Sequence, residues 1–357
     1  MIRTYKRKLI LNQAQSERIT SWIGVCRMVH NMALEIRINS YRNLGVSVNK
    51  FELMKQATSI RDIDWVADVP AQCMQNAIER LDKAYQRFFK TCKNGGGFPK
   101  FASKKDYRSI IINNVNKTVR ITGNRVRVPK LGELKIFKDS PVIGNIKYLT
   151  IKSEVSGFYV TITCDEVPKK FASENQAIGL DMGVSNFCID SNGGFIANPK
   201  HFKKYERKLR IEGRSLSRKK KGSNGWKRQC KKLSLLHHKI SNVRRDFLHK
   251  ESTAIAKKYS EVYMEGLTIK NMVKNKSINK YILDCGWGIF KEMVSYKTDV
   301  TVVNPKYTSQ TCFECGEQDA KSRVSQSEFV CTSCGHISNA DINAAKNILS
   351  RGTALSR

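Results

Sequence analysis

The sequence predicts a multidomain α+β protein: helices and a small β-barrel in the N-terminal part, and an α/β part with a four-cysteine module after it. Three observations predict this organisation. Long helical patterns precede a run of short alternating strands between residues 107 and 168. From residue 177 onward, short apolar strands alternate with helical segments. Four cysteines stand in two close pairs within residues 312–334.

The N-terminal elements follow from local patterns. Residues 2–10 alternate basic and apolar side chains and predict a strand. Apolar spacing predicts helices over about 15–42 and, after a polar break, about 70–92, where Pro70 suits the first turn. The stretch NGGGFPKF (94–101) cannot continue a helix, so we place a module boundary there. The β runs that follow predict the barrel, which the first strand could join across the helical insertion.

The C-terminal elements are shorter and more apolar. Residues 177–197 and 260–265 predict strands, and about 226–258 predicts a long helix with apolar residues at alternating three- and four-residue steps. Residues 338–349 predict a further helix, opened by Asp341, whose Ala344 and Ala345 permit close packing onto a sheet.

The charge of the chain predicts its class of partner. Lys and Arg number 64 against 31 Asp and Glu, which gives a formal charge of +33. Repulsion among these charges destabilises a compact chain unless a polyanion offsets it. Nucleic acid is therefore the expected partner. No apolar run approaches about 18 residues, and the first ten lack a signal-peptide pattern, so we expect no membrane partner. The odd count of 11 cysteines argues against a disulfide framework and favours a reducing, cytoplasmic location.

Two groups of polar residues are candidates for nucleic-acid contact. The stretch SRKKKGSNGWKRQCKK (217–232) holds eight Lys or Arg and no acid, which favours a phosphate track over an ordinary solvated face. Its candidate residues are Arg218, Lys219, Lys220, Lys221, Lys227 and Arg228. Gln72, Gln75 and Asn76, near the start of the second helix, could reach base edges in a groove, although exposed amides are common.

The cysteine spacing predicts a structural zinc site. Cys312, Cys315, Cys331 and Cys334 follow the pattern C-x2-C-x15-C-x2-C, which is typical of a four-thiolate zinc ribbon. A glycine directly after each pair suits a tight knuckle. Four protein ligands leave no open position, so any chemistry must lie elsewhere.

Three carboxylates are candidates for that chemistry. Asp181 and Glu265 each end an apolar strand, and Asp341 opens a helix. Each alone is more often a turn or cap residue, but together they could converge at one edge of a sheet. Oxygen ligands of negative charge suit Mg²⁺, and two such ions about 4 Å apart could promote phosphodiester cleavage.

These residues lie in motifs that resemble TnpB, the OrfB-type, transposon-encoded RNA-guided nucleases related to compact type V CRISPR effectors. The matching pieces are IGLDMGVSNF, the basic block 217–250, VYMEGL, YTSQTCFECG, SRVSQSEFVCTSCGH and ADINAAKNIL. The resemblance is specific from about residue 175 to 357. Over 1–170 it rests on layout and on the AIERLDKAYQRFF helix.

The resemblance implies a domain plan. A wedge β-barrel domain would comprise 1–14 and 94–170, with a helical recognition insertion at 15–93. An RNase H-like RuvC nuclease domain would comprise 171–307 and 337–357, interrupted by a zinc ribbon at 308–336.

It also implies residue roles and partners. Asp181, Glu265 and Asp341 match the three RuvC acids. Arg323 matches an arginine that contacts the scissile phosphate. The alternative is that Arg323 is an ordinary arginine on the surface of the ribbon. The family often has a further acid two positions before the last of these aspartates, where this chain has Asn339 instead. A guide RNA from the transposon end would pair with double-stranded target DNA, while the protein reads a short flanking motif. The host would be prokaryotic, with the protein at the nucleoid; the oligomeric state stays open.

The expected function is a guide-RNA-directed DNA endonuclease that hydrolyses phosphodiesters with Mg²⁺ at one RuvC site. Two alternatives stay open: an RNA-guided DNA-binding repressor without cleavage, and an auxiliary transposase or regulator of transposition. A DNA cleavage assay distinguishes the endonuclease from the repressor. Joining of DNA strands without a guide RNA would favour the transposase.

Overall fold

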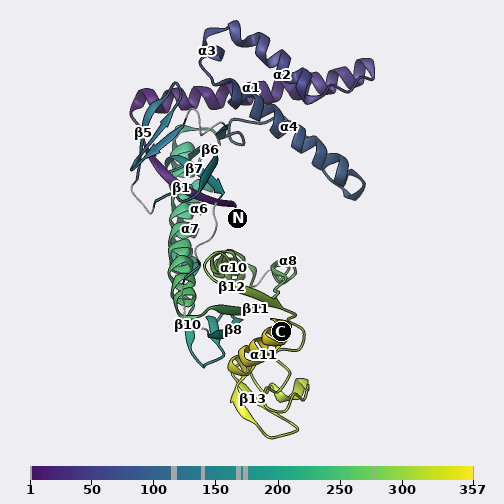
Figure 1. Ribbon diagram of the computed structural model, residues 1–357. Coiled ribbons are helices and arrows are strands. Elements are labelled where there is room, and N and C mark those ends of the chain that lie inside the picture. Colours follow the sequence, from purple (N-terminus) through teal and green to yellow (C-terminus); the bar gives the residue numbers. More distant parts are fainter. Residues whose placement is uncertain are drawn as a thin grey trace. The chain divides into compact units, whose positions relative to one another are not determined.

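The chain folds into two compact units, Met1–Val167 and Pro168–Arg357 (Figure 1). The computed structural model describes residues 2–113, 119–137, 141–165, 170–171, 176–275 and 278–356. Each unit combines helices with a sheet, which confirms the prediction of a multidomain protein built from both helices and sheets. The predicted domain junction at 170–171 is flanked by residues outside these ranges. Among the described helices, none has the length and apolarity that crossing a membrane requires.

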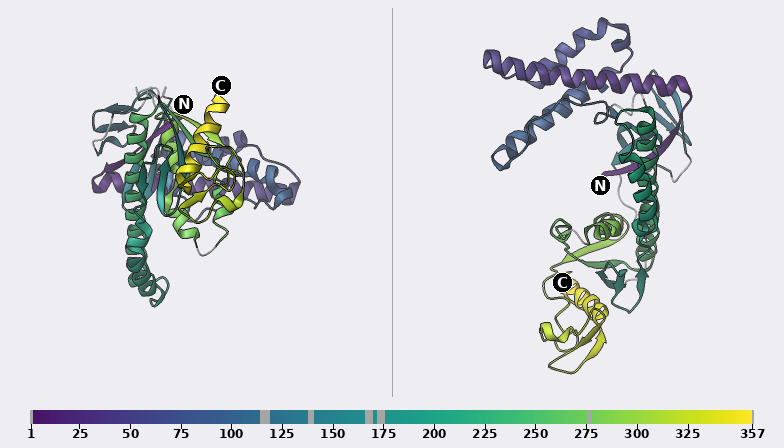
Figure 2. Two further views of the ribbon diagram at one scale, coloured as in Figure 1. Left: turned by 90° about the horizontal axis from the view of Figure 1, so that it is seen from below. Right: turned by 180° about the vertical axis from the view of Figure 1, so that it is seen from behind.

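Two long helices cross in the N-terminal unit (Figure 2). Helix α1 (Gln13–Leu44) begins at a capping box in which Asn12 accepts from the Gln15 amide, and it ends at Gly45 with φ of 68°. Helix α4 (Ala71–Thr91) begins directly after Pro70 and continues into a 3₁₀ turn, Cys92–Asn94. Both predicted helices are confirmed.

The stretch between these helices was expected to be a polar break, and that expectation was wrong. It contains α2 (Lys50–Ser59), a 3₁₀ turn (Ile60–Asp62) and the short α3 (Asp64–Ala67). Asn49 caps α2 by accepting from the Glu52 amide, and Leu53 and Ala57 are buried in the core of the unit. The capping box indicates the start of α2, which a search for apolar periodicity alone does not detect.

An antiparallel sheet completes the N-terminal unit. Its seven strands lie in the order β2-β6-β7-β1-β5-β4-β3. They are β1 (Ile2–Ile10), β2 (Ser109–Ile112), β3 (Arg120–Thr122), β4 (Arg125–Val128), β5 (Gly132–Ile136), β6 (Asn145–Glu154) and β7 (Gly157–Asp165). Strand β1 joins across the helical insertion, as predicted, because it pairs with both β7 and β5.

The sheet is open in the part of the chain that the structure describes, since its edge strands β2 and β3 do not pair with each other. Closure into a barrel stays a prediction. The helices and the sheet share one hydrophobic core, in which Trp22, Leu81 and Leu149 are fully buried. The glycine-rich stretch 94–101 therefore separates elements rather than hydrophobic cores.

The C-terminal unit is built on a five-stranded sheet in the order β10-β9-β8-β11-β12. Its strands are β8 (Ala177–Met182), β9 (Asn186–Asp190), β10 (Phe195–Ala197), β11 (Glu261–Glu265) and β12 (Asp299–Val303). Strand β8 pairs parallel with β11, and β11 parallel with β12, whereas β9 pairs antiparallel with both of its neighbours. Strand β9 alone therefore runs against the others.

Helices cover both faces of this sheet. One face packs against α7 (Asn224–Lys258) and α10 (Trp287–Ser295), where Phe187 meets Phe290 edge to face at 4.9 Å. The other face packs against α11 (Ala340–Ser356). The unit also holds α6 (His201–Ser217), which pairs with α7, and the short α8 (Ile269–Met272) and α9 (Asn279–Cys285).

Small residues let α11 approach the sheet closely, as predicted for Ala344 and Ala345. A Cβ atom at Gly179 of β8 would lie 2.2 Å from the Ala345 carbonyl oxygen, and one at Gly352 would lie 2.1 Å from the Tyr263 ring. No side chain fits at either position without a shift of the helix. These two contacts set how closely α11 lies against β8 and β11.

The cysteine segment forms a small module between β12 and α11. It contains a 3₁₀ turn (Ala320–Ser322) and a hairpin of β13 (Glu328–Val330) and β14 (Ile337–Asn339). Its core consists of Cys312, Phe329, Cys331 and Ala340, the first residue of α11. The module is therefore anchored to the helix that carries Asp341.

Candidate functional site

Asp181 and Glu265 lie on one face and at one edge of the five-stranded sheet. Side chains alternate between faces along a strand, so the buried Leu180 and Met264 point toward α7 and α10 while their successors point toward α11. Leu180 pairs with Met264, so the parallel register puts Asp181 and Glu265 at adjacent strand ends. The local sequence puts each acid near the end of its own strand, and the parallel pairing of the two strands brings the two acids together.

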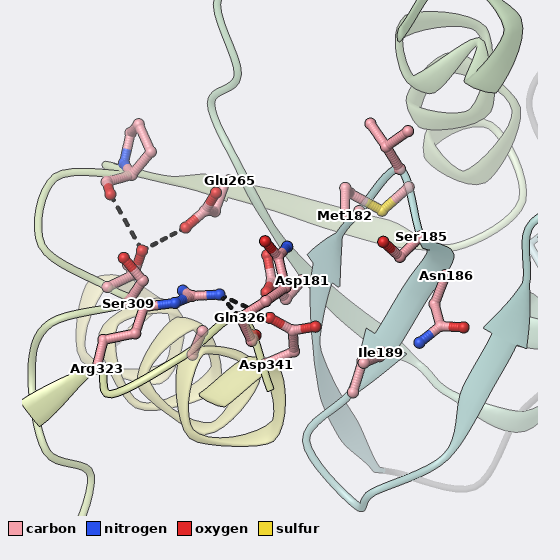
Figure 3. Close-up of a pocket in the computed structure, with 15 residues that line it drawn as sticks. Asp181, Met182, Ser185, Asn186, Ile189, Glu265, Ser309, Arg323, Gln326 and Asp341 are labelled. Atoms are coloured by element: carbon pink, nitrogen blue, oxygen red, sulfur yellow. Dashed lines mark hydrogen bonds and ion pairs between the residues drawn. The ribbon is translucent and has the colours of Figure 1, made fainter. Parts of the chain in front are cut away.

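Asp341 completes this group from α11 (Figure 3). Asn339 directly precedes this helix, and its side-chain oxygen accepts from the backbone amides of Asp341 and Ile342 at 3.0 and 3.2 Å. Asn339 therefore acts as the helix cap. Asp181, Glu265 and Asp341 line a single pocket, in agreement with the predicted convergence of the three acids.

Arg323 reaches the same pocket from the cysteine module. Its guanidinium donates to Asp341 Oδ1 at 3.1 Å and to the Gln326 carbonyl oxygen at 3.1 Å. Its backbone is held by a bridge to the fully buried Phe329. Arg323 is thus held at the carboxylate pocket with 27% of its side chain exposed, and its contact with the scissile phosphate stays a prediction.

Two of the carboxyl groups in the pocket have a raised pKa. Burial, followed by the negative charges of Glu265 and Asp341, raises the pKa of Asp181 to about 7, while Arg323 opposes the shift. Burial also raises the pKa of Glu265, against a hydrogen bond from Thr308. A divalent cation would relieve this repulsion, and the oxygen-only donor set suits Mg²⁺.

The carboxylates are more widely spread than the thiols. Among the described residues, only the four cysteines bring three or more potential ligand atoms to within 4.8 Å of one another. The three acids share a pocket without reaching that spacing, and Arg323 and Thr308 each bond one of them.

The four thiols match a tetrahedral zinc site. Cys312 Sγ lies 3.8 Å from Cys334 Sγ, and Cys315 Sγ lies 3.6 Å from Cys331 Sγ. Zn–S bonds of about 2.3 Å in a tetrahedron separate sulfurs by about 3.8 Å, whereas a disulfide needs about 2.05 Å. Gly316 and Gly335 adopt φ of 78° and 73°, as the predicted knuckles require.

Other pocket residues were missed by the sequence reasoning. Ser185 and Asn186 follow β8, while Thr308, Ser309 and Gln326 come from the cysteine module and the segment before it. The last three lie inside YTSQTCFECG and SRVSQSEFVCTSCGH, so membership of the same motifs was the available signal.

The predicted nucleic-acid contacts are placed unevenly. All six basic residues at the turn between α6 and α7 are exposed: Arg218, Lys219, Lys220, Lys221, Lys227 and Arg228. Of the three amides on α4, Gln75 is exposed and Gln72 is half-buried. Asn76 is buried, and its amide donates to the Gln72 carbonyl oxygen at 2.8 Å, so it does not present a base-reading edge to solvent.

Comparison with known proteins identifies relatives over the full chain. The OrfB_IS605 family model, described as "Probable transposase", matches residues 160–276, and the Cas12f1-like TNB domain matches 287–348. A family model described as "Helix-turn-helix domain" matches residues 1–45, which fold here as β1 and one long helix.

Two curated relatives and one solved structure extend this picture. The chain is 32% identical to "Putative RNA-guided DNA endonuclease InsQ" of Escherichia coli (strain K12), covering 99% of this chain and 93% of the relative. It is 26% identical to "Putative RNA-guided DNA endonuclease" of Streptomyces pristinaespiralis, covering 99% and 90%. The mini-RNA-guided endonuclease CRISPR-Cas_phi3 has a similar fold, with a TM-score of 0.52, 10% identity, and coverage of 100% of this chain and 93% of that one.

The fold and the pocket define a multidomain α/β protein in which a carboxylate pocket adjoins a zinc-ribbon-type module. The identity to InsQ over nearly the whole of both chains is specific enough to assign a family. The chain belongs to the TnpB family.

Proposed function

We propose that this protein is a transposon-encoded, guide-RNA-directed DNA endonuclease that hydrolyses target phosphodiesters with Mg²⁺ at a single site. The observation that carries the proposal is the meeting of Asp181, Glu265 and Asp341, from two strands and a helix, in one pocket. Relatives that align along the chain bear names that describe the same activity. An acidic pocket in a chain of charge +33 would repel nucleic acid unless cations intervened.

The domain plan supports this function. The observations that support an RNase H-like RuvC domain are the five-stranded sheet with one antiparallel strand and the two acids at the ends of adjacent parallel strands. We assign this domain to 171–307 and 337–357 and the zinc ribbon to 308–336. We assign the wedge to 1–14 and 94–170, and the recognition insertion to 15–93.

The three carboxylates would hold two Mg²⁺ ions. When bound, such ions supply Lewis acidity: they promote attack by water and neutralise charge that develops on the phosphate and the leaving oxygen. Asp181 would be one of the ligands of these ions, because it lines the same pocket as Glu265 and Asp341 and the negative charges of both act on it. Arg323 would leave Asp341 for the scissile phosphate, for which its planar guanidinium is well suited.

Zinc would have a structural role. Its four thiolate ligands come from one module that packs on the start of α11, so the metal stabilises the platform that carries Arg323 and Asp341. Because a closed four-thiolate site leaves no open coordination position, no chemical step is assigned to it.

The partners follow from charge and from the proposed mechanism. The exposed basic turn between α6 and α7 would bind phosphates of the guide RNA or of its duplex with DNA. Base pairing would provide sequence specificity, and the protein would read a short motif beside the target, with Gln72 and Gln75 as candidate contacts.

The test is cleavage by the protein purified with its co-expressed guide RNA. Sequencing of the bound RNA should return one discrete transposon-end transcript. The complex should cut matching double-stranded DNA when Mg²⁺ is present, and Asp181→Ala should bind the target but not cut it. Binding without cleavage by the unmodified protein would favour the repressor, and undiminished cutting by Asp181→Ala would overturn the assigned site.

A further inference from the structure

Glu265 is held by a side chain that the proposed mechanism does not use. The Thr308 hydroxyl donates to Glu265 Oε1 and lies 3.1 Å from the Pro305 carbonyl oxygen. Thr308 is only 2% exposed, so water does not compete for this contact. The hydroxyl has one proton, and a carboxylate is the stronger acceptor, so the bond to Glu265 prevails when Glu265 is ionised.

Thr308 is itself fixed from α11. The Asn347 amide donates to the Thr308 carbonyl oxygen at 3.0 Å and to the Thr311 carbonyl oxygen at 2.7 Å, which uses both of its protons. Tyr307, directly before Thr308, has φ of 64°, a conformation that non-glycine residues rarely adopt. Such a conformation persists only where surrounding contacts hold it, and Asn347 supplies two of them.

The same face of α11 also bonds the first zinc knuckle. Asn343, one helical turn before Asn347, donates to the Thr311 carbonyl oxygen at 2.8 Å and accepts from the Phe313 amide at 2.9 Å. Phe313 directly follows the ligand Cys312, and Asn343 is 1% exposed. A continuous set of hydrogen bonds therefore connects the knuckle to Glu265 through α11.

We propose that Thr308 is a positioning residue that orients Glu265 for divalent-ion binding, and that Asn347 and Asn343 make its position depend on the folded zinc module. The proposal rests on the proposed function only in assigning Glu265 to a divalent ion. A glutamate at a strand end has three side-chain torsions to fix, and an anchored carboxylate binds an ion without losing that freedom.

The direct test is metal binding by the full-length protein freed of nucleic acid. Binding of Mn²⁺, measured by electron paramagnetic resonance, should weaken about tenfold in Thr308→Val, which keeps the shape and loses the hydroxyl. Thr308→Ser should restore binding to near the parent value. Thr301→Val, on β12 outside the pocket, is the matched control and should leave the affinity unchanged. Thr308→Ala serves as a second variant if Thr308→Val does not fold.

A double-mutant cycle separates positioning from a merely structural role. If Thr308 acts through Glu265, adding Thr308→Val to Glu265→Gln should cause no further loss of Mn²⁺ affinity. An equal loss in both backgrounds, or full affinity in Thr308→Val, would overturn the inference. In the guided cleavage assay, Thr308→Val should raise the Mg²⁺ requirement about tenfold with little change in target binding. A parent protein that binds Mn²⁺ but cuts no DNA would count against the proposed function alone.

Discussion

Arg323 of the cysteine module lies 3.1 Å from Asp341 at the start of α11, so the module contributes a cation to the carboxylate pocket. The second cysteine pair separates Arg323 from Asp341 in the sequence, and the fold brings the two residues together as one ion pair. The pair is half-buried on both sides, where Coulombic attraction is stronger than at an exposed surface. The position of the arginine depends on the fold of the module, and the position of the aspartate on the helix cap.

We expect Arg323→Ala to slow cleavage more than it weakens binding. Loss of one cation that stabilises developing phosphate charge costs about 100-fold or more in rate. Single-turnover cleavage by the guide complex should fall by that order, with target affinity within about threefold of the parent. Arg323→Lys should recover only part of the rate, because lysine lacks the planar pair of donors. A fall in affinity with an unchanged rate would instead assign Arg323 to binding.

The raised pKa of Asp181 predicts a pH-dependent effect on stability. Its folded-state pKa of about 7 exceeds the ordinary value near 3.9, so the folded state binds its proton more tightly than the unfolded state. Stability contributed by the protonated group is present below about pH 4 and is lost as pH rises through 7. Asp181→Asn should therefore be more stable than the parent at pH 8, by about 1–3 kcal/mol, without Mg²⁺.

The measurement is the difference in melting temperature between Asp181→Asn and the parent across pH 4–8. The difference should grow with pH up to about 7 and then level off. A difference that shrinks as pH rises would contradict the raised pKa of Asp181, which burial and then the charges of Glu265 and Asp341 cause.

Loss of one thiol should unfold the module before it affects the sheet. Cys331→Ser should remove the bound zinc, measured by elemental analysis, and lower the melting temperature, because binding of zinc and folding of the module are coupled. Cys92→Ser is the matched control: this cysteine is exposed and outside the cluster, so zinc content and melting should not change. Full zinc retention in Cys331→Ser would refute the four-thiolate assignment.

The salt dependence of guide-RNA binding tests whether the basic turn contacts phosphates. Replacing Lys219, Lys220 and Lys221 with alanine should weaken guide-RNA binding and reduce the slope of log affinity against log salt by about 0.7 for each lost phosphate contact. Replacing the exposed Lys270 and Lys274 is the control, and the same assay should show a smaller change. An unchanged slope in the triple variant would make this turn an ordinary solvated surface.

A buried ion pair should matter more than an exposed one within the same unit. Arg244 lies 2.8 Å from the buried Asp284, which also accepts from the Phe202 amide at 2.6 Å and so connects α6, α7 and α9. Asp284→Asn should lower the free energy of unfolding by about 2–4 kcal/mol. Asp246→Asn, which breaks the exposed pair with Lys250, should change it by less than about 0.5 kcal/mol. Similar effects of both would contradict the assigned role of burial.

Much of the molecule was predictable from sequence because the relevant signals are local. Helical periodicity identified α1, α4 and α7, and cysteine spacing identified the module whose thiols the structure brings together. Asp181, Glu265 and Asp341 were recognisable because the first two each end an apolar strand and the third opens a helix. Helix α2 was missed because its start depends on the Asn49 capping box rather than on a long apolar stripe.

The sequence by itself determined the element types, the cationic character and the residues that could bind metals, because each depends on neighbours within a few positions. Only the tertiary structure decided that β8 and β11 pair in parallel register, that Gly179 admits α11, and that Arg323 meets Asp341. It also decided that Asn76 is buried and that Thr308 bonds Glu265. These relationships join residues 18 to 166 positions apart, and no local pattern encodes them: they arise when separate elements pack around shared cores.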